Sequence, residues 1–307
     1  MLRKRIPLRR KLRTLLHRSA NPSFFSQEIA VNSYPKTIRR FFISTRVFFI
    51  SLAAFFIASC GNSADNSQTP IDAIEHDTPE TMAPDLATLL AGESRFAGDR
   101  ERDANRKPAK VIAFVGIEPG MNVIDVIAAG GYYTEVLSLA VGNDGHVTAQ
   151  NPAVVLQMRD GANEKQLSER LANGRLQNVS RLNKEIAELT ADDGPFDAAM
   201  IGLNLHDIYN NYGEAGAVGA MQAIGATLKP GAVFGVIDHH GADGADNKEL
   251  HRMRIEDAIR VAEAAGFVVE AQSGMLHVHD DDLTGSVFAE GRRGNTHRFV
   301  LRLRKPE

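Results

Sequence analysis

Histidine and aspartate side chains follow two apolar runs of the chain, residues 196–203 and 232–237. His206 and Asp207 come after the first run, and His239 follows the second. Both runs have the composition of buried strands, and the carboxyl ends of parallel strands share one edge of a sheet. Because imidazole is a base near neutral pH, we predict His206, Asp207 and His239 as catalytic residues, with His206 taking a proton. The alternative is a structural role, in which these side chains cap helices and tie loops to the sheet.

No metal site is predicted from these side chains. The histidines lack a tight ligand spacing such as the His-Glu-x-x-His of zinc enzymes. Cys60 is the one cysteine of the chain, so a cysteine-based zinc site and an intrachain disulfide are both excluded.

A second candidate site follows the apolar run 122–126. Small residues occupy positions 128–131, before the start of a helical pattern, and Asp125 precedes them. Small side chains let a ligand approach the backbone, and a helix N-terminus offers free N–H groups. The same loop can simply pack a strand against a helix. An acid that binds a ribose is expected about 20 residues further on, and Asn151 stands there instead.

Helical patterns alternate with apolar runs along residues 81–307. Continuous apolar runs predict a parallel sheet that is covered on both faces. We expect an α/β fold, Rossmann-like and doubly wound, with a mostly parallel seven-stranded sheet, helices on both faces and a single domain. Two helices are expected over 215–228 and 249–265. The expected strands are 122–126, 146–150, 179–182, 196–203, 232–237, 267–271 and 298–303.

The chain resembles the class I S-adenosylmethionine-dependent methyltransferases. Residues 125–131 (Asp-Val-Ile-Ala-Ala-Gly-Gly) resemble the acid-x-Gly-x-Gly-x-Gly motif of that family, and residues 228–231 resemble the turn before its fifth strand. A closer resemblance, over about residues 98–306, is to exported methyltransferase-like proteins. They share patterns such as the Gly-Gly-Tyr-Tyr-Thr-Glu of residues 130–135 and the ending at 298–306.

The resemblance implies S-adenosylmethionine as the cofactor. It implies that Gly130 and Gly131 hold the methionine end, that Asp125 orients it and that Asn151 meets the ribose. Two roles stay open for Tyr132: it stacks on the adenine, or it packs the start of the helix, as tyrosines at such positions more often do. Ala129 and Asn204 complete the implied cofactor-binding set.

Two departures from the family motif predict weak cofactor binding. Ile127 and Ala129 stand where the motif has its first two glycines, and a β-branched side chain there crowds the loop. Asn151 replaces the acid that binds the ribose.

The first 60 residues are predicted to be a basic leader with a lipoprotein signal peptide. They hold 12 Lys and Arg residues and a single acid, and an apolar run at 47–58 ends in Ile-Ala-Ser before Cys60. This ending resembles a bacterial lipobox, which implies lipidation of Cys60. The alternative is an uncleaved anchor helix. Residues 61–80 are rich in Asn, Ser, Asp, Thr and Pro and predict a flexible tether, followed by the methyltransferase-like domain at 81–307.

These patterns predict a lipoprotein on the periplasmic face of a bacterial membrane. The outer membrane is favoured because Gly61, rather than an aspartate, follows the cysteine. The acidic remainder of the chain argues against a nucleic-acid partner, which needs basic patches. Three functions stay open, of which the least favoured is a metal-dependent enzyme on the same scaffold. The first is a membrane-tethered methyltransferase that acts on a small-molecule or lipid-associated acceptor; the second is a catalytically silent lipoprotein of the same fold that binds a small ligand or a protein.

Overall fold

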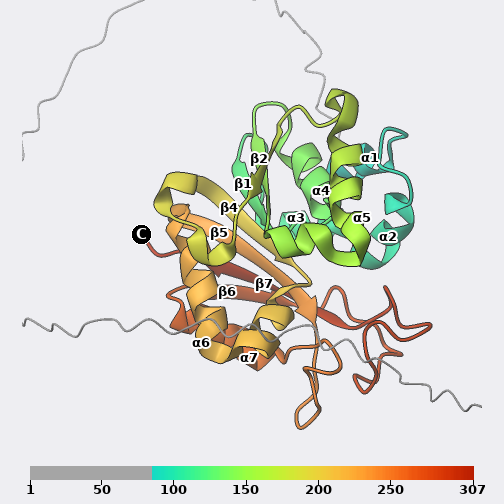
Figure 1. Ribbon diagram of the computed structural model, residues 1–307, viewed down its shortest axis with the longest axis vertical. Coiled ribbons are helices and arrows are strands. Elements are labelled where there is room, and N and C mark those ends of the chain that lie inside the picture. The colour runs from blue at the N-terminus through green and yellow to red at the C-terminus, as the bar shows by residue number, and fades with distance from the viewer. Residues whose placement is uncertain (1–84) are drawn as a thin grey trace, which may run out of the picture. The chain divides into compact units, whose positions relative to one another are not determined.

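The computed structural model of the 307-residue chain describes residues 85–307 (Figure 1). Cys60 and the predicted boundaries at residues 60 and 80 lie outside this part. The helices are α1 (Leu86–Ala91), α2 (Asp99–Arg106), α3 (Pro108–Val115), α4 (Tyr132–Val141), α5 (Ala153–Leu171), α6 (Leu205–Ala226) and α7 (Ile255–Ala264). The strands are β1 (Asn122–Val126), β2 (His146–Asn151), β3 (Val179–Asn183), β4 (Phe196–Gly202), β5 (Leu228–His239), β6 (Val268–Ser273) and β7 (Arg298–Arg304).

The strands form one seven-stranded sheet in the order β3-β2-β1-β4-β5-β7-β6. The pairs from β3 through β5 are parallel, whereas β7 runs antiparallel to both β5 and β6. Val126 pairs with Gln150 on β2 and with Ile201 on β4, so the carboxyl ends of the central strands meet at one edge. This architecture confirms the predicted fold class.

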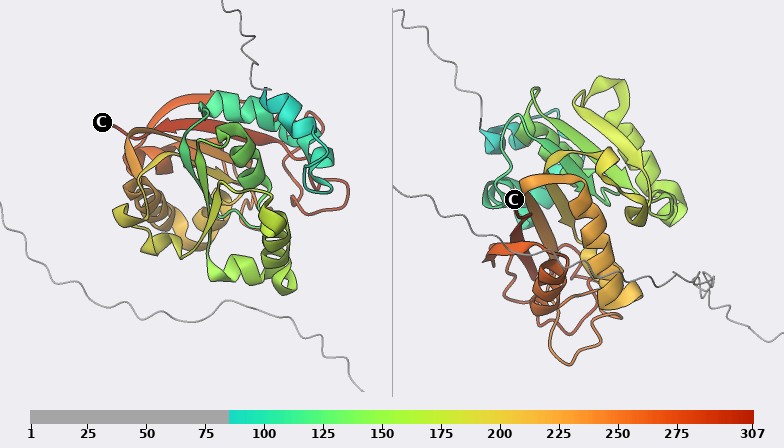
Figure 2. Two further views of the ribbon diagram at one scale, coloured as in Figure 1. Left: turned by 90° about the horizontal axis from the view of Figure 1, so that it is seen from above. Right: turned by 90° about the vertical axis from the view of Figure 1, so that its left-hand side faces the viewer.

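Helices cover both faces of the sheet (Figures 1 and 2). Alternate residues of each central strand point to opposite faces. Ile124 and Ile201 pack in the core that contains the apolar residues of α6 and α7. Val123 and Met200 pack in the core that contains those of α3 and α4. Burial on both faces explains why these strands are largely apolar, with Asp125 of β1 as a buried exception.

Two helices differ from the sequence prediction. Helix α6 begins at Leu205 rather than at residue 215, and Gly213 interrupts it with φ 70° and ψ −178°. Its first segment, which is polar and therefore resembles a loop in sequence, places His206 and Asp207 in the first helical turn. Helix α7 begins at Ile255 rather than at residue 249, and the segment before it is irregular. Within residues 85–307, none of the helices has the length and the apolar composition needed to span a bilayer.

Candidate functional site

The loop between β1 and α4 adopts an unusual backbone conformation. Ile127, Ala129 and Gly131 have φ values of 53°, 50° and 82°. Only glycine visits this left-handed region freely, because the Cβ atom of other residues approaches the following carbonyl oxygen. Ile127 and Ala129 therefore hold strained conformations at the two positions where the family motif has glycine.

The end of β2 holds this loop in place. The backbone N–H groups of Ile127 and Ala129 donate to Gln150 Oε1 (3.0 Å) and to Asn151 Oδ1 (2.8 Å). Asn151 also donates from Nδ2 to the carbonyl oxygen of Ala129 (3.4 Å). Both ends of the Asn151 amide thus bind the loop, so a contact between Asn151 and a ribose would have to replace these hydrogen bonds.

Gly130 and Gly131 allow α5 to approach the loop closely. A Cβ atom on Gly130 would lie 1.9 Å from Gln166 Oε1, and one on Gly131 would lie 2.8 Å from Leu167 Cδ1. Packing against α5 and a positive φ both favour glycine at position 131, whereas at position 130 a larger residue would require the flexible Gln166 side chain to move.

Asp125 lies inside the sheet rather than at its open edge. Its carboxylate accepts a hydrogen bond from Thr134 Oγ1 at 2.7 Å. Burial raises the pKa of Asp125 to about 7, and the Thr134 hydrogen bond offsets only part of that effect. The carboxyl group therefore joins β1 to α4, the two elements that flank the loop.

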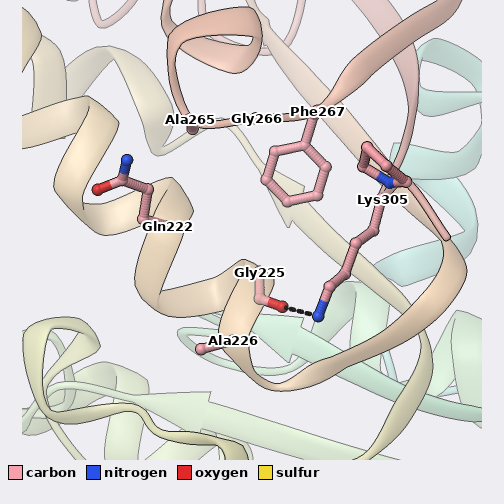
Figure 3. Close-up of a pocket in the computed structure, with 8 residues that line it drawn as sticks. Gln222, Gly225, Ala226, Ala265, Gly266, Phe267 and Lys305 are labelled. Carbon is pink, nitrogen blue, oxygen red and sulfur yellow. Dashed lines mark hydrogen bonds between the residues drawn. The ribbon is translucent and has the colours of Figure 1, made fainter. Parts of the chain in front are cut away.

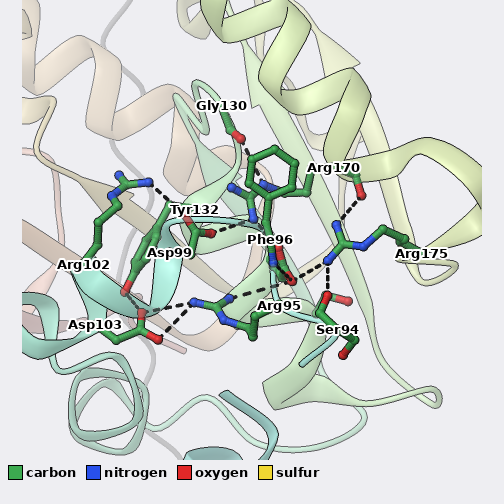
Figure 4. A network of polar contacts seen from close by, with 12 residues as sticks. Ser94, Arg95, Phe96, Asp99, Arg102, Asp103, Gly130, Tyr132, Arg170 and Arg175 are labelled. Carbon is green, nitrogen blue, oxygen red and sulfur yellow. Dashed lines mark hydrogen bonds and ion pairs between the residues drawn. The ribbon is translucent and has the colours of Figure 1, made fainter. Parts of the chain in front are cut away.

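A buried ionic network fastens α2, α4 and α5 together next to the loop (Figure 4). Arg170 is fully buried and donates to the carbonyl oxygen of Gly130 (3.0 Å), to Asp99 (2.7 Å) and to Glu135. Arg175 donates to the other carboxylate oxygen of Glu135 (2.9 Å). Because these charges lie away from water, each depends on its partners.

Tyr132 belongs to the same region and is only 4% exposed. Its hydroxyl donates to Asp103 Oδ1 at 2.5 Å, and the guanidinium carbons of Arg102 and Arg106 each lie 4.5 Å from its ring centroid. The ring therefore already makes cation–π contacts with two arginines of α2, and adenine stacking would require these arginines to move. Asn204 lies at the open edge, where its Nδ2 donates to the carbonyl oxygen of Gly202 (2.7 Å).

His206 is buried between two carboxylates. Its Nδ1 lies 2.6 Å from Asp238 Oδ1, its backbone N–H donates to Asp238 Oδ2 (2.7 Å), and its Nε2 lies 3.3 Å from Asp207 Oδ1. Burial by itself lowers the pKa of His206, but the two carboxylates outweigh it and raise the pKa to about 10. With a pKa of about 10, His206 is an imidazolium at neutral pH. In that state it cannot accept a proton.

His239 has the opposite electrostatic environment. Burial lowers its pKa well below the usual value, and the positive charges of His206, Arg298 and Arg252 lower it further. Its Nδ1 lies 2.7 Å from the hydroxyl of Thr296, and its ring centroid lies 5.7 Å from that of His206. His239 is therefore a neutral imidazole at the same edge of the sheet.

The structure adds His251 to the predicted group of His206, Asp207 and His239. His251 Nδ1 lies 3.2 Å from Asp207 Oδ1, although 44 residues separate the two in sequence. Ligand atoms of His206, Asp207 and His251 all lie within 4.8 Å of one another. No motif links His251 to the other two, so sequence patterns gave no signal for it.

Two shallow hollows lie outside this group. One, of about 340 Å³, is lined by Gly225, Phe267 and Lys305, and the Lys305 amine donates to the Gly225 carbonyl (Figure 3). These residues flank the amino ends of the parallel strands, so this hollow lies at the opposite edge from the histidines. The other, of about 380 Å³, is lined by residues of α5 with Phe96.

Comparison with known proteins gives one curated relative and many solved structures. No family model matches the sequence. The demethylmenaquinone methyltransferase of Staphylococcus aureus (strain MRSA252) is 28% identical over 124 residues, which are 40% of this chain and 45% of the relative. The chain thus spans less than half the length of this relative.

Among the solved structures, the [4+2]-cyclase SpnF superposes with a TM-score of 0.50 at 20% identity, covering 72% of this chain and 93% of SpnF. A SAM-dependent methyltransferase from Aquifex aeolicus gives a TM-score of 0.47 at 19% identity, covering 66% of this chain and 97% of that protein. The strand order, with β7 antiparallel between β5 and β6, is decisive for the fold. The chain has the class I S-adenosylmethionine-dependent methyltransferase fold. Apart from Asp125, which lies within β1, the described candidate residues lie at or after the carboxyl ends of the parallel strands, the edge at which open α/β sheets generally bind ligands.

Proposed function

We propose that the chain is an S-adenosylmethionine-dependent methyltransferase. The observation that carries the proposal is the left-handed loop 127–131, which lies where the strand order reverses between β1 and β4. Ligands of open α/β sheets bind at such a switch point. The partial match to a curated methyltransferase supports the same conclusion.

The residues at this edge fit the cofactor, with one adjustment. Ala129 and Asn204 are half-buried, so backbone and amide groups lie within reach of a ligand. The adjustment is at Asn151, whose amide must turn from Ala129 to meet a ribose. When bound, S-adenosylmethionine supplies an activated methyl group. Ala129, Asn204 and the turned Asn151 hold it through hydrogen bonds.

His239, rather than His206, is the better candidate for the base. A base must be unprotonated before it takes a proton from the acceptor. The pKa of His239 is lowered, whereas that of His206 is raised to about 10. The hydroxyl of Thr296 can accept from Nδ1–H of His239, and in that tautomer Nε2 keeps its lone pair for the proton of the acceptor.

The location and the acceptor complete the proposal. The lipobox-like segment before Cys60 supports a lipid anchor on the periplasmic face of a bacterial membrane, with the outer membrane favoured. An enzyme held there would act on a small-molecule or lipid-associated acceptor.

Equilibrium titration of the full chain with S-adenosylmethionine and S-adenosylhomocysteine tests the proposal. We expect saturable binding at micromolar concentration or weaker. Asn151→Asp should tighten it about tenfold, because hydrogen bonds from ribose hydroxyls to a carboxylate are stronger than those to an amide. Asn143→Asp, in an exposed turn, is the control for added charge and should leave the affinity unchanged. Absence of binding by both the natural chain and Asn151→Asp would refute the proposal.

A silent protein of the same fold is the second candidate. The double hydrogen bond between Asn151 and Ala129 favours it, since this contact closes the loop without a ligand. Binding of S-adenosylhomocysteine without methyl transfer to any offered envelope lipid or small acceptor would support this candidate.

A further inference from the structure

We infer that His206, Asp207 and His251 form a binding site for a divalent transition-metal ion, with zinc as the favoured occupant. Within residues 85–307 these three side chains bring together two imidazole nitrogens and a carboxylate oxygen, all within 4.8 Å of one another. This inference goes beyond the proposed methyltransferase function and does not depend on it.

The spacing of the ligand atoms suits a metal ion. Asp207 Oδ1 lies 3.3 Å from His206 Nε2 and 3.2 Å from His251 Nδ1. Metal–ligand bonds of about 2.0–2.1 Å place neighbouring ligand atoms about 3.0–3.4 Å apart. The two measured separations therefore match adjacent corners of a coordination shell.

Asp238 orients His206 as a metal ligand. It holds Nδ1 at 2.6 Å and is itself fully buried, which directs Nε2 toward Asp207 and His251. Metal-binding histidines nearly always donate their other ring nitrogen to a carboxylate or carbonyl in this way. Nε2 is buried, and despite the proximity of Asp207 it has no aligned hydrogen-bond partner. A buried polar atom without a partner costs free energy, and a metal ion would remove that cost.

The local charge also calls for a cation. Asp207 and Asp238 surround the His206 ring. Arg252, which is buried nearby, already makes two hydrogen bonds to Asp281, at 2.9 and 2.8 Å. A divalent ion held by His206 and Asp207 would lie close to both carboxylates and balance part of their negative charge.

The ligand types select the metal. Two imidazoles with one carboxylate suit zinc and other first-row transition metals, whereas calcium and magnesium prefer oxygen ligands alone. The side chains of Asp207 and His251 are 47% and 41% exposed, so an ion can enter from solvent. Three protein ligands leave a coordination position for water or for an oxygen atom of a ligand.

Calorimetric titration of the chelator-treated full chain with Zn²⁺ tests the site. We expect one Zn²⁺ ion to bind per chain, with micromolar or tighter affinity. Repeating the titration in two buffers of different ionisation enthalpy should show proton release, because a metal-bound His206 cannot keep its Nε2 proton. Binding of Co²⁺ at the same site should add visible absorption bands.

Asp207→Asn and His251→Gln should each weaken Zn²⁺ binding at least tenfold and remove the Co²⁺ bands. Both residues are partly exposed, so these variants should still fold. His279→Gln, an exposed histidine outside the group, is the matched control and should bind as the natural chain does. Undiminished Zn²⁺ binding by both site variants, or no saturable binding by the natural chain, would overturn the inference. Titration with S-adenosylmethionine in the presence of chelator tests the proposed function separately.

Discussion

Ile127 and Ala129 hold the same strained backbone conformation but differ in what their side chains contribute. The left-handed region costs a residue other than glycine about 1–2 kcal/mol. Ala129 packs little, whereas Ile127 packs against the core beneath α6 and α7. The two positions therefore separate backbone strain from packing.

Replacing each residue by glycine should change stability in opposite directions. Ala129→Gly should stabilise the fold by up to about 1 kcal/mol, since relief of strain exceeds the entropy lost by glycine. Ile127→Gly should destabilise it by about 1–3 kcal/mol, because lost packing exceeds the relief. Denaturant unfolding of the two variants measures both values. Equal destabilisation by both would contradict the assignment of strain to Ala129.

Asp125 should make stability depend on pH in the acidic range. Its pKa is about 7 in the folded protein against an ordinary value of 3.8, so the folded state binds the proton more tightly. The stabilising contribution of the protonated form is therefore complete below pH 3.8 and is lost as the pH rises to 7. Asn at this position keeps an acceptor for Thr134 and carries no charge.

Compared with the natural chain, Asp125→Asn should accordingly gain relative stability as the pH rises from about 4 to about 7. Unfolding free energies measured across this range test the sign. Asp144→Asn, in an exposed turn, should give a flat difference. A flat difference for Asp125→Asn as well would show that the buried carboxyl titrates normally.

Sequence patterns placed His206, Asp207 and His239 close together, because residues after buried strands lie at one edge of a parallel sheet, and in the structure these side chains do lie side by side. They did not find His251, which comes from an irregular segment before α7 and approaches Asp207 only in the folded chain. The same patterns predicted His206 as the base. They could not show that Asp238 lies against its ring and raises its pKa, because that contact forms only in the folded chain.

At the scale of elements, α5 depends on Arg170. This helix is interrupted at Met158–Gly161, and its second segment lies against α2 and α4 through the ionic network of Figure 4. Removing one member of a buried ion pair leaves an uncompensated charge, which costs about 3–5 kcal/mol.

Arg170→Met should therefore lower the free energy of unfolding by up to about 3–5 kcal/mol, because Asp99 and Glu135 lose their fully buried partner, while the more exposed Arg102 and Arg175 stay beside them. Lys165→Met on the same helix, with a side chain 78% exposed, should change it by less than about 0.5 kcal/mol. Urea unfolding compares the two. A loss below about 1 kcal/mol for Arg170→Met would mean that solvent reaches the network.

Apolar runs predicted the strands well, because a strand buried on both faces has few alternatives. Helix boundaries were harder to predict where the helix surface is polar. The first segment of α6 carries Asn210 and Asn211, which favour turns, and α2 has Arg and Asp at most positions. Contacts with α4, such as that between Asp103 and Tyr132, hold α2 in its place, and these contacts join residues distant in sequence.

At the scale of the whole molecule, the chain joins two chemically different parts. Residues 1–60 are strongly basic, while the remaining residues hold more acidic than basic side chains and include the class I fold at 85–307. A net charge of −3 for the whole chain conceals this division. Cys60 stands at the junction, which is the position expected of a lipidated residue that joins a folded domain to a membrane.

Cys60→Ser should abolish incorporation of labelled palmitate and leave an unprocessed precursor. The reason is chemical: only the thiol of Cys60 can form the thioether that carries the diacyl group, and the chain has no other cysteine. Two acyl chains anchor a protein stably. Without them, the variant should leave the membrane fraction, unless its uncleaved apolar run 47–58 holds it there. Ser63→Ala, three residues beyond the cysteine, is the control and should label as the natural chain does. Equal palmitate labelling of Cys60→Ser and the natural chain would exclude the lipoprotein assignment. If both proteins instead remain as unlabelled precursors, the result favours the uncleaved anchor helix.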